Sequence, residues 1–321
     1  MRRRVSTRIA LEAVVKRFGA RVALAGISFE VAAGEVVALL GPNGAGKSTT
    51  LGVLATVLSF DAGRVTVAGH AVPAEAAAAR RSLGLVPQQT AVYPTLTARE
   101  NVRFFARALG VPRRRVAPAA NEVLARVALL ERSDEPVTRF SLGMRRRLNL
   151  ACGIVHQPDV LLLDEPTVGI DPQSRERVFE AVAELAWNGT AVLYSTHVME
   201  EAERVCDRVV LLDAGRVIAA GTPAALVDAT AIRPRVVLRT EQPLPAGWLG
   251  RVPTARVHAT GDGVVEVTVT GRDGVPAVVA AAVQAGATLV ELTVHRPNLA
   301  DAFFALTGRA LRDDDPAAVS A

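Results

Sequence analysis

One of only two lysines in the chain stands in the glycine-rich segment GPNGAGKS, residues 41–48. The segment follows Val36–Leu40, a continuous apolar run typical of a buried parallel strand, and a helix is expected over residues 49–58. Its glycines permit turns that aim successive backbone N–H groups at one point, and the helix adds its positive N-terminal end. Lys47 supplies a compact charge for β- and γ-phosphates, and Ser48 a hydroxyl for Mg²⁺. We therefore predict a loop that binds a nucleoside triphosphate, in preference to a glycine-rich turn that binds nothing.

Two carboxylates follow a second buried strand, expected over residues 160–163. Asp164 and Glu165 would lie at its carboxyl end, where α/β sheets bind ligands. Asp164 can hold Mg²⁺ through water, and Glu165 can polarise an attacking water as a general base. A third strand is expected over residues 191–195, and His197 follows it, within reach of a γ-phosphate. The alternatives are two solvated carboxylates and a structural histidine.

Length and composition bound the class of protein. The 321 residues suit one large domain plus a small one, and 50% hydrophobic content with 4% aromatics favours helices packed on a sheet. A net charge of +5 is too modest to indicate nucleic acid, a membrane surface or phosphorylated ligands by itself. Cys152 and Cys206 have no metal-like spacing and predict buried free thiols. Charge or proline breaks the best apolar stretches, so we expect no membrane-spanning helix. The basic N-terminus has charges within its apolar part and no small-residue cleavage site after it, so we expect no signal peptide.

Six motifs, in a fixed order, make about residues 8–227 resemble the nucleotide-binding subunit of an ABC transporter. GPNGAGKST resembles the Walker A motif, LVPQQ the Q-loop, SLGMR the signature, VLLLDEPT the Walker B motif, GIDP the D-loop and STH the H-switch. The resemblance implies an α/β fold of the P-loop NTPase type. A RecA-like core would carry an antiparallel β subdomain and a helical subdomain at about residues 88–157, within a nucleotide-binding domain of residues 1–227.

The resemblance also implies the residues of the site. It implies catalytic roles for Glu165, His197 and Gln88, and Mg²⁺ binding by Ser48, Gln88 and Asp164. The residues implied to bind ATP are Phe18, Gly41, Pro42, Asn43, Gly44, Ala45, Gly46, Lys47, Ser48, Thr49, Ser141, Gly143, Met144 and Asp171. Phe18 holds the place of an aromatic side chain that stacks on adenine, and a core phenylalanine before a strand is the alternative.

The signature departs from the usual Ser-Gly-Gly-Gln of the family. Ser141 is kept as a helix cap, but Leu142 replaces the first glycine and Met144 the glutamine. Gly143 remains where a backbone must come close. We expect Leu142 to be tolerated if its side chain turns back into the helical subdomain. A weakened site that closes slowly is the alternative.

The resemblance implies a mechanism and partners. Two copies would close head to tail on two ATP molecules and drive a separate polytopic membrane permease. PTLTARENVRFFARALG and GIDPQSR are similar to ATPases of ABC-2 type exporters of the daunorubicin- or bacitracin-resistance kind. That similarity implies drug, antibiotic or lipid-like efflux, a peripheral place on the cytoplasmic face of the membrane, and no nucleic-acid partner.

Three other classes are weighed against this interpretation. ABC ATPases without a transport role usually carry two cassettes or a long coiled-coil insertion, and the sequence holds one P-loop. A P-loop kinase would lack the signature and the element around His197. A cassette that binds ATP without hydrolysing it is disfavoured by the presence of both Glu165 and His197. The transported substrate cannot be read from the sequence.

Residues 228–310 predict a small α+β domain. Strands are expected at 235–239, 264–269 and 288–295, a turn at 271–274, and helices at 276–285 and 298–306. The last helix would begin with an Asn298–Asp301 cap. A subunit-contact or regulatory role competes with that of a stabilising appendage. Residues 311–321 are expected to form a disordered tail. The run at 113–115 predicts a solvated helix start, with contact to anionic lipid headgroups as the alternative.

Overall fold

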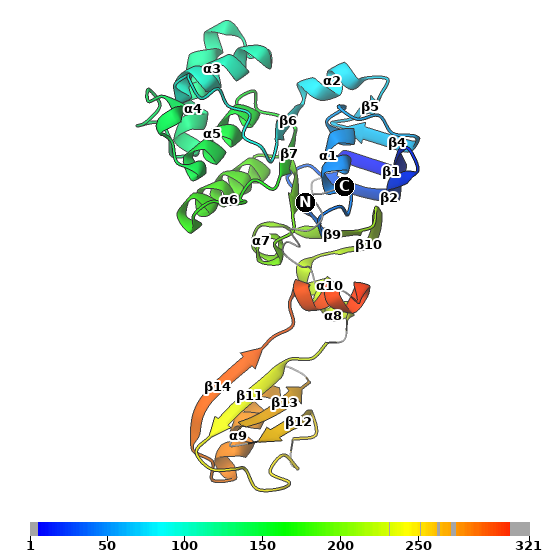
Figure 1. Ribbon diagram of the computed structural model, residues 1–321, viewed down its shortest axis with the longest axis vertical. Coiled ribbons are helices and arrows are strands. Elements are labelled where there is room, and N and C mark those ends of the chain that lie inside the picture. Colours follow the sequence, from blue (N-terminus) through cyan, green and yellow to red (C-terminus); the bar gives the residue numbers. More distant parts are fainter. Residues whose placement is uncertain (1–5, 231, 251, 262–263, 271–273, 309–321) are drawn as a thin grey trace. The chain divides into compact units, whose positions relative to one another are not determined.

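The computed structural model describes residues 6–230, 232–250, 252–261, 264–270 and 274–308 (Figure 1). Contacts divide the chain after Pro223 into two compact units. Residues 311–321, for which the sequence predicted a disordered tail, lie outside the described residues, as do three residues of the turn predicted at 271–274.

Six strands form the central sheet of the first unit, in the order β10-β9-β3-β8-β7-β6. They are β3 (Val36–Leu40), β6 (Leu83–Val86), β7 (Val160–Asp164), β8 (Ala191–Thr196), β9 (Arg208–Asp213) and β10 (Arg216–Gly221). Neighbours pair in parallel except β9 and β10. Strand β3 is buried over its whole length, which confirms the buried parallel strand predicted there. The parallel order brings the carboxyl ends of β3, β6, β7 and β8 to one edge, so the segments that follow these strands meet there.

A second, antiparallel sheet has the order β2-β1-β4-β5. Its strands are β1 (Thr7–Phe18), β2 (Arg21–Ala32), β4 (Ala62–Val67) and β5 (His70–Val72). Helix α1 (Lys47–Leu54) contacts β2 and β4 of this sheet and β7 of the central sheet. One hydrophobic core therefore joins both sheets through the helix, with members such as Leu24, Val37, Leu54 and Val210.

Helix α1 lies earlier in the chain than the predicted residues 49–58. It starts directly after Gly46, and it ends at Leu54 because Thr56 adopts a left-handed backbone conformation with φ of 60°. The N–H groups of Val57 and Leu58 then both bond to the carbonyl of Gly52, which closes the helix.

The helical part of the first unit lies between β6 and β7 in sequence. It contains α3 (Ala98–Ala108), the 3₁₀ turns Arg113–Arg115 and Val137–Arg139, α4 (Val116–Arg126) and α5 (Leu142–Ile154). The three α-helices pack against one another, and Figure 1 shows them gathered beside β6 and β7. Thr97 and Glu100 cap α3 reciprocally. The arginine run at 113–115 is exposed, in agreement with the solvated helix start that was predicted.

The remaining helices of this unit are α2 (Ala76–Arg81), α6 (Pro172–Trp187) and α7 (Met199–Val205), and α8 (Pro223–Ala229) begins at the last residue of this unit and belongs to the second unit. Asp171 caps α6 by accepting from the N–H of Ser174. Cys152 and Cys206 are both buried and free, as the sequence predicted. No helix in the described part of the chain is long and apolar enough to cross a membrane.

The second unit contains an antiparallel sheet in the order β12-β13-β11-β14. Besides α8, its elements are β11 (Arg235–Thr240), β12 (Ala255–Gly261), β13 (Val264–Val269), α9 (Gly274–Gln284), β14 (Leu289–His295) and α10 (Leu299–Thr307). Apolar residues of α9, among them Val278 and Ala282, pack with Leu238 and Val267 on one face of the sheet. The Asn298–Asp301 cap on α10 is confirmed, with each side chain accepting from the other residue's N–H.

Candidate active site

The segment between β3 and α1 has the shape that its glycines allow. Gly44 and Gly46 have φ of 80° and 110°, a region that favours glycine, and Gly46 is the N-cap of α1. A side chain on Gly46 would also meet the carbonyl of Ala23 and a methyl of Leu24 at 2.9 Å. The loop therefore needs glycine for its backbone conformation and, at Gly46, also for space. The loop leads into the N-terminus of α1, whose free N–H groups lie at the carboxyl edge of the central sheet.

Lys47 lies buried at the base of this loop. Its Nζ donates to the carbonyls of Gly41 at 2.8 Å and Pro42 at 3.3 Å, and lies 3.5 Å from Oε1 of Glu165. Burial lowers the pKa of Lys47, and the nearby Glu165 and Asp164 carboxylates oppose that shift. A phosphate group beside Nζ would further favour the charged ammonium, so the surroundings of Lys47 suit an anionic ligand.

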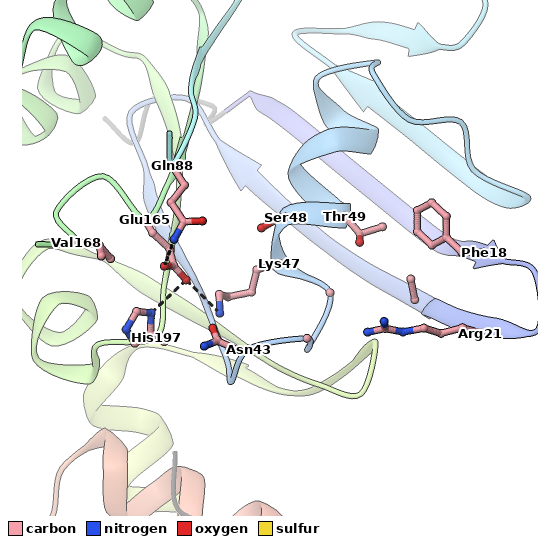
Figure 2. A pocket seen from close by; sticks show the side chains of 13 residues that line it. Phe18, Arg21, Asn43, Lys47, Ser48, Thr49, Gln88, Glu165, Val168 and His197 are labelled. Carbon is pink, nitrogen blue, oxygen red and sulfur yellow. Dashed lines mark hydrogen bonds and ion pairs between the residues drawn. The ribbon is translucent and has the colours of Figure 1, made fainter. Parts of the chain in front are cut away.

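A pocket of about 470 Å³ opens beside Lys47 (Figure 2). The predicted residues that line it are Phe18, Asn43, Gly44, Gly46, Lys47, Ser48, Thr49, Gln88, Glu165 and His197. These residues come from the end of β1, the loop before α1 together with the first turn of α1, and the segments after β6, β7 and β8. The pocket thus gathers residues from five separate stretches of the sequence, four of which follow strands of the central sheet at its carboxyl edge.

Glu165 stands at the centre of the polar groups in this pocket. It is 8% exposed, and Figure 2 shows its carboxylate between Gln88 and His197. Gln88 Nε2 donates to Oε2 at 3.0 Å, and His197 Nδ1 lies 3.1 Å from Oε1. Its backbone adopts φ of 45°, which is uncommon for a glutamate, and its N–H bonds to the carbonyl and hydroxyl oxygens of Ser195, both at 3.2 Å. The carboxylate is therefore held in place by contacts from three other segments, as a general base that orients water would require.

Oxygen groups that suit Mg²⁺ lie next to Ser48, which lines the pocket, although the predicted ligand Asp164 does not line it. Ser48 Oγ is 3.4 Å from Asp164 Oδ1, and Ser195 Oγ donates to the same carboxylate oxygen at 2.6 Å. Mg²⁺ prefers hard oxygen ligands and completes its shell with water and phosphate oxygens. The hydroxyl of Ser48 and the carboxylate of Asp164 therefore fit this ion.

Phe18 lies at the last position of β1, and its side chain is 48% exposed. The alternative of a core phenylalanine is therefore wrong. Lys16 Nζ lies 5.0 Å from the centre of the ring. Figure 2 shows Phe18 on the far side of the P-loop from Glu165, so an adenine stacked on it would leave its phosphates directed toward Lys47.

Three residues of the loop do not line the pocket, and the first of them, Gly41, accepts from Lys47 through its carbonyl. Ala45 is buried in the hydrophobic core rather than facing the pocket. Pro42 also does not line the pocket, and its carbonyl accepts from Lys47 instead.

Arg21, Ala23 and Val168 line the pocket, but the sequence motifs did not point to them. Arg21 pairs with Phe18 across the turn between β1 and β2, so it returns to the same end of the sheet. A two-residue turn at Gly19 and Ala20 was the signal that could have located it.

Four further predicted residues, Ser141, Gly143, Met144 and Asp171, also lie outside this pocket, around the start of α5. Ser141 caps α5 by accepting from the N–H of Met144 at 3.2 Å, which confirms the predicted cap. Gly143 faces Asp171 and Ser174 of α6: a side chain there would meet Ser174 Oγ at 2.3 Å and Asp171 Oδ2 at 2.8 Å. The close approach that requires glycine at this position therefore occurs within one chain.

The side chain of Leu142 is 42% exposed. A side chain on Gly169 would lie 3.2 Å from its Cδ2 atom, so Leu142 extends beside the segment that leads to Asp171. It is thus not buried within the helical subdomain, where the sequence led us to expect it. The condition under which we expected leucine to be tolerated is therefore not met, and a weakened site that closes slowly stays the alternative.

We expect Gly143→Ala to destabilise the protein. The added methyl must displace Ser174 and Asp171 at the first turn of α6, which costs about 1–3 kcal/mol for an overpacked site. Thermal unfolding followed by circular dichroism measures the effect. Leu142→Ala, at the exposed neighbouring position, is the matched control and should melt close to the wild type. Equal melting temperatures for Gly143→Ala and the wild type would contradict the crowding described above.

Comparison with known proteins gives consistent matches. The sequence pattern of the family described as ABC transporter matches residues 24–168. The chain is 40% identical over 308 residues to the linearmycin resistance ATP-binding protein LnrL of Bacillus subtilis (strain 168), covering 94% of this chain and 99% of that protein. It is 41% identical over 305 residues to the daunorubicin resistance ATP-binding protein DrrA3 of Streptomyces coeruleorubidus, covering 94% and 96%.

Among solved structures, the ATP-binding cassette MJ0796, in a dimeric post-hydrolysis state bound to ADP and Pi, is similar with a TM-score of 0.61 and 25% identity. That match covers 67% of this chain and 98% of MJ0796. The two resistance proteins instead match nearly the whole chain, so their similarity includes the second unit.

Proposed function

Because the chain belongs to the ABC transporter family and is an ATP-binding cassette with ATPase activity, we propose that it is the ATPase subunit of an ABC-2 type export system. In this proposal two copies close head to tail on two ATP molecules and drive a separate polytopic permease. The observation that carries the ATPase part is the buried Glu165 carboxylate, held between Gln88 and His197 beside the P-loop lysine.

The residues on the pocket wall divide the work of hydrolysis. The glycine-rich loop and Lys47 bind the phosphates, and Phe18 stacks on the adenine. Glu165 orients the attacking water and accepts its proton, while Gln88 holds the carboxylate in place. His197 lies against the same carboxylate and contacts the γ-phosphate.

Ser48 and Asp164 would hold Mg²⁺, with Gln88 at the same edge of the pocket. The ion offsets phosphate charge when it is bound. Ser48 and Asp164 are already 3.4 Å apart, so little movement of this chain is required to present both oxygens to it.

The predicted residues around the start of α5 would contact the ATP that is bound by a second copy of the chain. Ser141, Gly143 and Met144 form the start of α5, where backbone N–H groups and the helix dipole favour an anion. Asp171 lies against this start and caps α6. We assign these residues to the γ-phosphate of the ATP that is bound by the partner copy. The dimeric form in which MJ0796 was solved supports this arrangement.

The export role rests on similarity along the whole chain to two ATP-binding proteins named for resistance to linearmycin and daunorubicin. We infer efflux of a drug, an antibiotic or a lipid-like compound. A subunit of such a system is placed at the cytoplasmic face of the membrane, attached through its permease.

Purification of the tagged chain from detergent-solubilised membranes of its source organism tests the export role. We expect a polytopic membrane protein to be recovered with it in stoichiometric amount, and the complex to hydrolyse ATP. Phe104→Asp, in an exposed aromatic pair with Tyr93 on the helical part, should weaken this recovery without altering ATP affinity. Recovery of the chain without any polytopic partner would contradict the export role.

A further inference from the structure

A second carboxylate, Glu201 of α7, lies behind the active site and is 4% exposed. Thr167 Oγ1 donates to its Oε1 at 2.7 Å. Its Oε2 accepts from Thr196 Oγ1 at 3.0 Å and from the hydroxyl of Tyr194 at 3.1 Å. Burying a carboxylate costs free energy unless hydrogen-bond donors surround it. Loss of any one of the three hydroxyl donors is therefore expected to destabilise the buried Glu201.

Two of these donors flank the residues that act on ATP. Thr196 directly precedes His197, and its hydroxyl also accepts from the N–H of Val198 at 3.0 Å. The hydroxyl of Thr196 therefore ties both sides of His197 to Glu201. Thr167 lies two positions after Glu165, and its hydroxyl donates to the other carboxylate oxygen of Glu201. One side chain thus holds the segment of Glu165 and the segment of His197.

This arrangement restricts the hydrogen positions. A hydroxyl donates one hydrogen, and Thr167, Tyr194 and Thr196 can each direct theirs to Glu201. Burial and the neighbouring Glu201 raise the pKa of Tyr194 well above its ordinary value, so Tyr194 stays a donor throughout the range in which the enzyme works. The carboxylate can accept from all three, and the hydroxyl oxygens of Thr167 and Tyr194 also lie 3.1 Å apart, where either can donate to the other.

A third segment joins the cluster through Arg175. Its Nε lies 3.6 Å from Glu201 Oε1, which is an ion pair but too long for a hydrogen bond. Arg175 stands in the first turn of α6, next to Ser174 and Asp171, where Gly143 of the signature packs. The same carboxylate therefore contacts the helix that follows the D-loop.

We propose that Glu201 is a positioning residue of the ATPase: it sets the separation of Glu165 and His197 by binding the segments that carry both, and links them to the start of α6. The inference rests on the roles proposed above for Glu165 and His197. Glu201 does not line the nucleotide pocket, so it acts through these two residues and not on ATP itself.

Glu201→Gln tests this role because it keeps the shape but replaces one acceptor oxygen by an amide that donates. Either Thr167 or the Tyr194–Thr196 pair then faces a second donor. We expect kcat to fall about 10- to 100-fold, as for removal of an orienting partner behind a reactive group. The dissociation constant of ATP, measured by titration calorimetry, should change less than about threefold, because the phosphate loop is untouched.

Glu200→Gln is the matched control, since it removes the same charge from an exposed position of the same helix. It should hydrolyse ATP like the wild type. A Glu201→Gln enzyme with wild-type kcat, or one that loses ATP binding and kcat in equal proportion, would overturn the proposal. If Glu201→Gln does not fold, Thr196→Val is the second test, because it removes the hydroxyl that connects the His197 segment to Glu201. A wild-type kcat in Thr196→Val would then overturn the proposal.

A double-mutant cycle separates positioning from general stability. In a His197→Ala background, Glu201→Gln should reduce kcat much less than it does in the wild type. The reason is that His197, one of the two residues that Glu201 positions, has already been removed. If the fold reductions in kcat from His197→Ala and Glu201→Gln simply multiply in the double variant, the two residues are not coupled and the positioning role is contradicted. Wild-type hydrolysis by Glu165→Gln would refute the catalytic assignment itself, whereas a large loss there with no effect of Glu201→Gln would refute the positioning role alone.

Discussion

Glu165→Gln is expected to abolish almost all ATP hydrolysis while leaving ATP bound. The glutamine keeps the size of the side chain, but its amide cannot accept a proton from water, and loss of a general base lowers the rate by about 10²- to 10⁴-fold. Glu165 is the one carboxylate among the described residues that line the pocket, while Asp164 bonds to Ser48 and Ser195 and does not line it. Phosphate release in the presence of Mg²⁺ measures the effect.

The same variant should accumulate the closed dimer, since hydrolysis is what reopens it. Size-exclusion chromatography with ATP should then show twice the mass of the monomer, whereas the wild type returns to the monomer. Glu200→Gln is the control for loss of one negative charge. If Glu165→Gln still turns over ATP and stays monomeric, both the catalytic assignment and the proposed dimer are wrong.

Lys47→Ala is expected to remove nucleotide binding. Nζ is held by the carbonyls of Gly41 and Pro42 and faces Glu165, so the ammonium is fixed at the base of the loop before a phosphate binds. Truncating one member of a buried charge pair costs about 2–5 kcal/mol, or a loss of affinity of about 30-fold or more. The loss is larger than for a surface lysine because water is excluded around Nζ.

Titration calorimetry with ATP measures this loss, and the rise of melting temperature with added ATP gives a second readout. Arg216→Ala removes one positive charge from an exposed position outside the pocket and should bind ATP normally. Lys47→Arg separates charge from shape, because a planar guanidinium does not fit the position of a compact ammonium. Unchanged affinity in Lys47→Ala would contradict the phosphate-binding loop.

The phosphate loop is the part of the site that local sequence decides. Residues 41–48 are contiguous, Gly44 and Gly46 adopt the conformations that only glycine takes readily, and Lys47 folds back onto carbonyls of the same loop. The strand before it and the helix after it were predicted for the same reason, although α1 is shorter than its apolar pattern suggested. Hydrogen bonds within one short segment need no knowledge of the rest of the fold.

The meeting of Gln88, Glu165 and His197 depends on the order of strands in the sheet. Each follows a different strand, β6, β7 or β8, and these three strands are neighbours in the central sheet. The sequence indicated a strand before Glu165 and another before His197, whereas Gln88 was assigned only through resemblance to a known family. The same resemblance indicated that the three residues belong together. Their spacing along the chain by itself did not.

The sequence by itself determined which residue types could bind phosphate, attract Mg²⁺ and activate water, because these are properties of single side chains and of contiguous turns. Only the tertiary structure decided what surrounds them. Glu201 is one of several glutamates in a helix until packing buries it under Thr167 and Thr196, and Gly143 requires glycine because α6 packs against it. Burial and contact between distant segments arise from the packing of whole elements, and no short stretch of sequence contains that information.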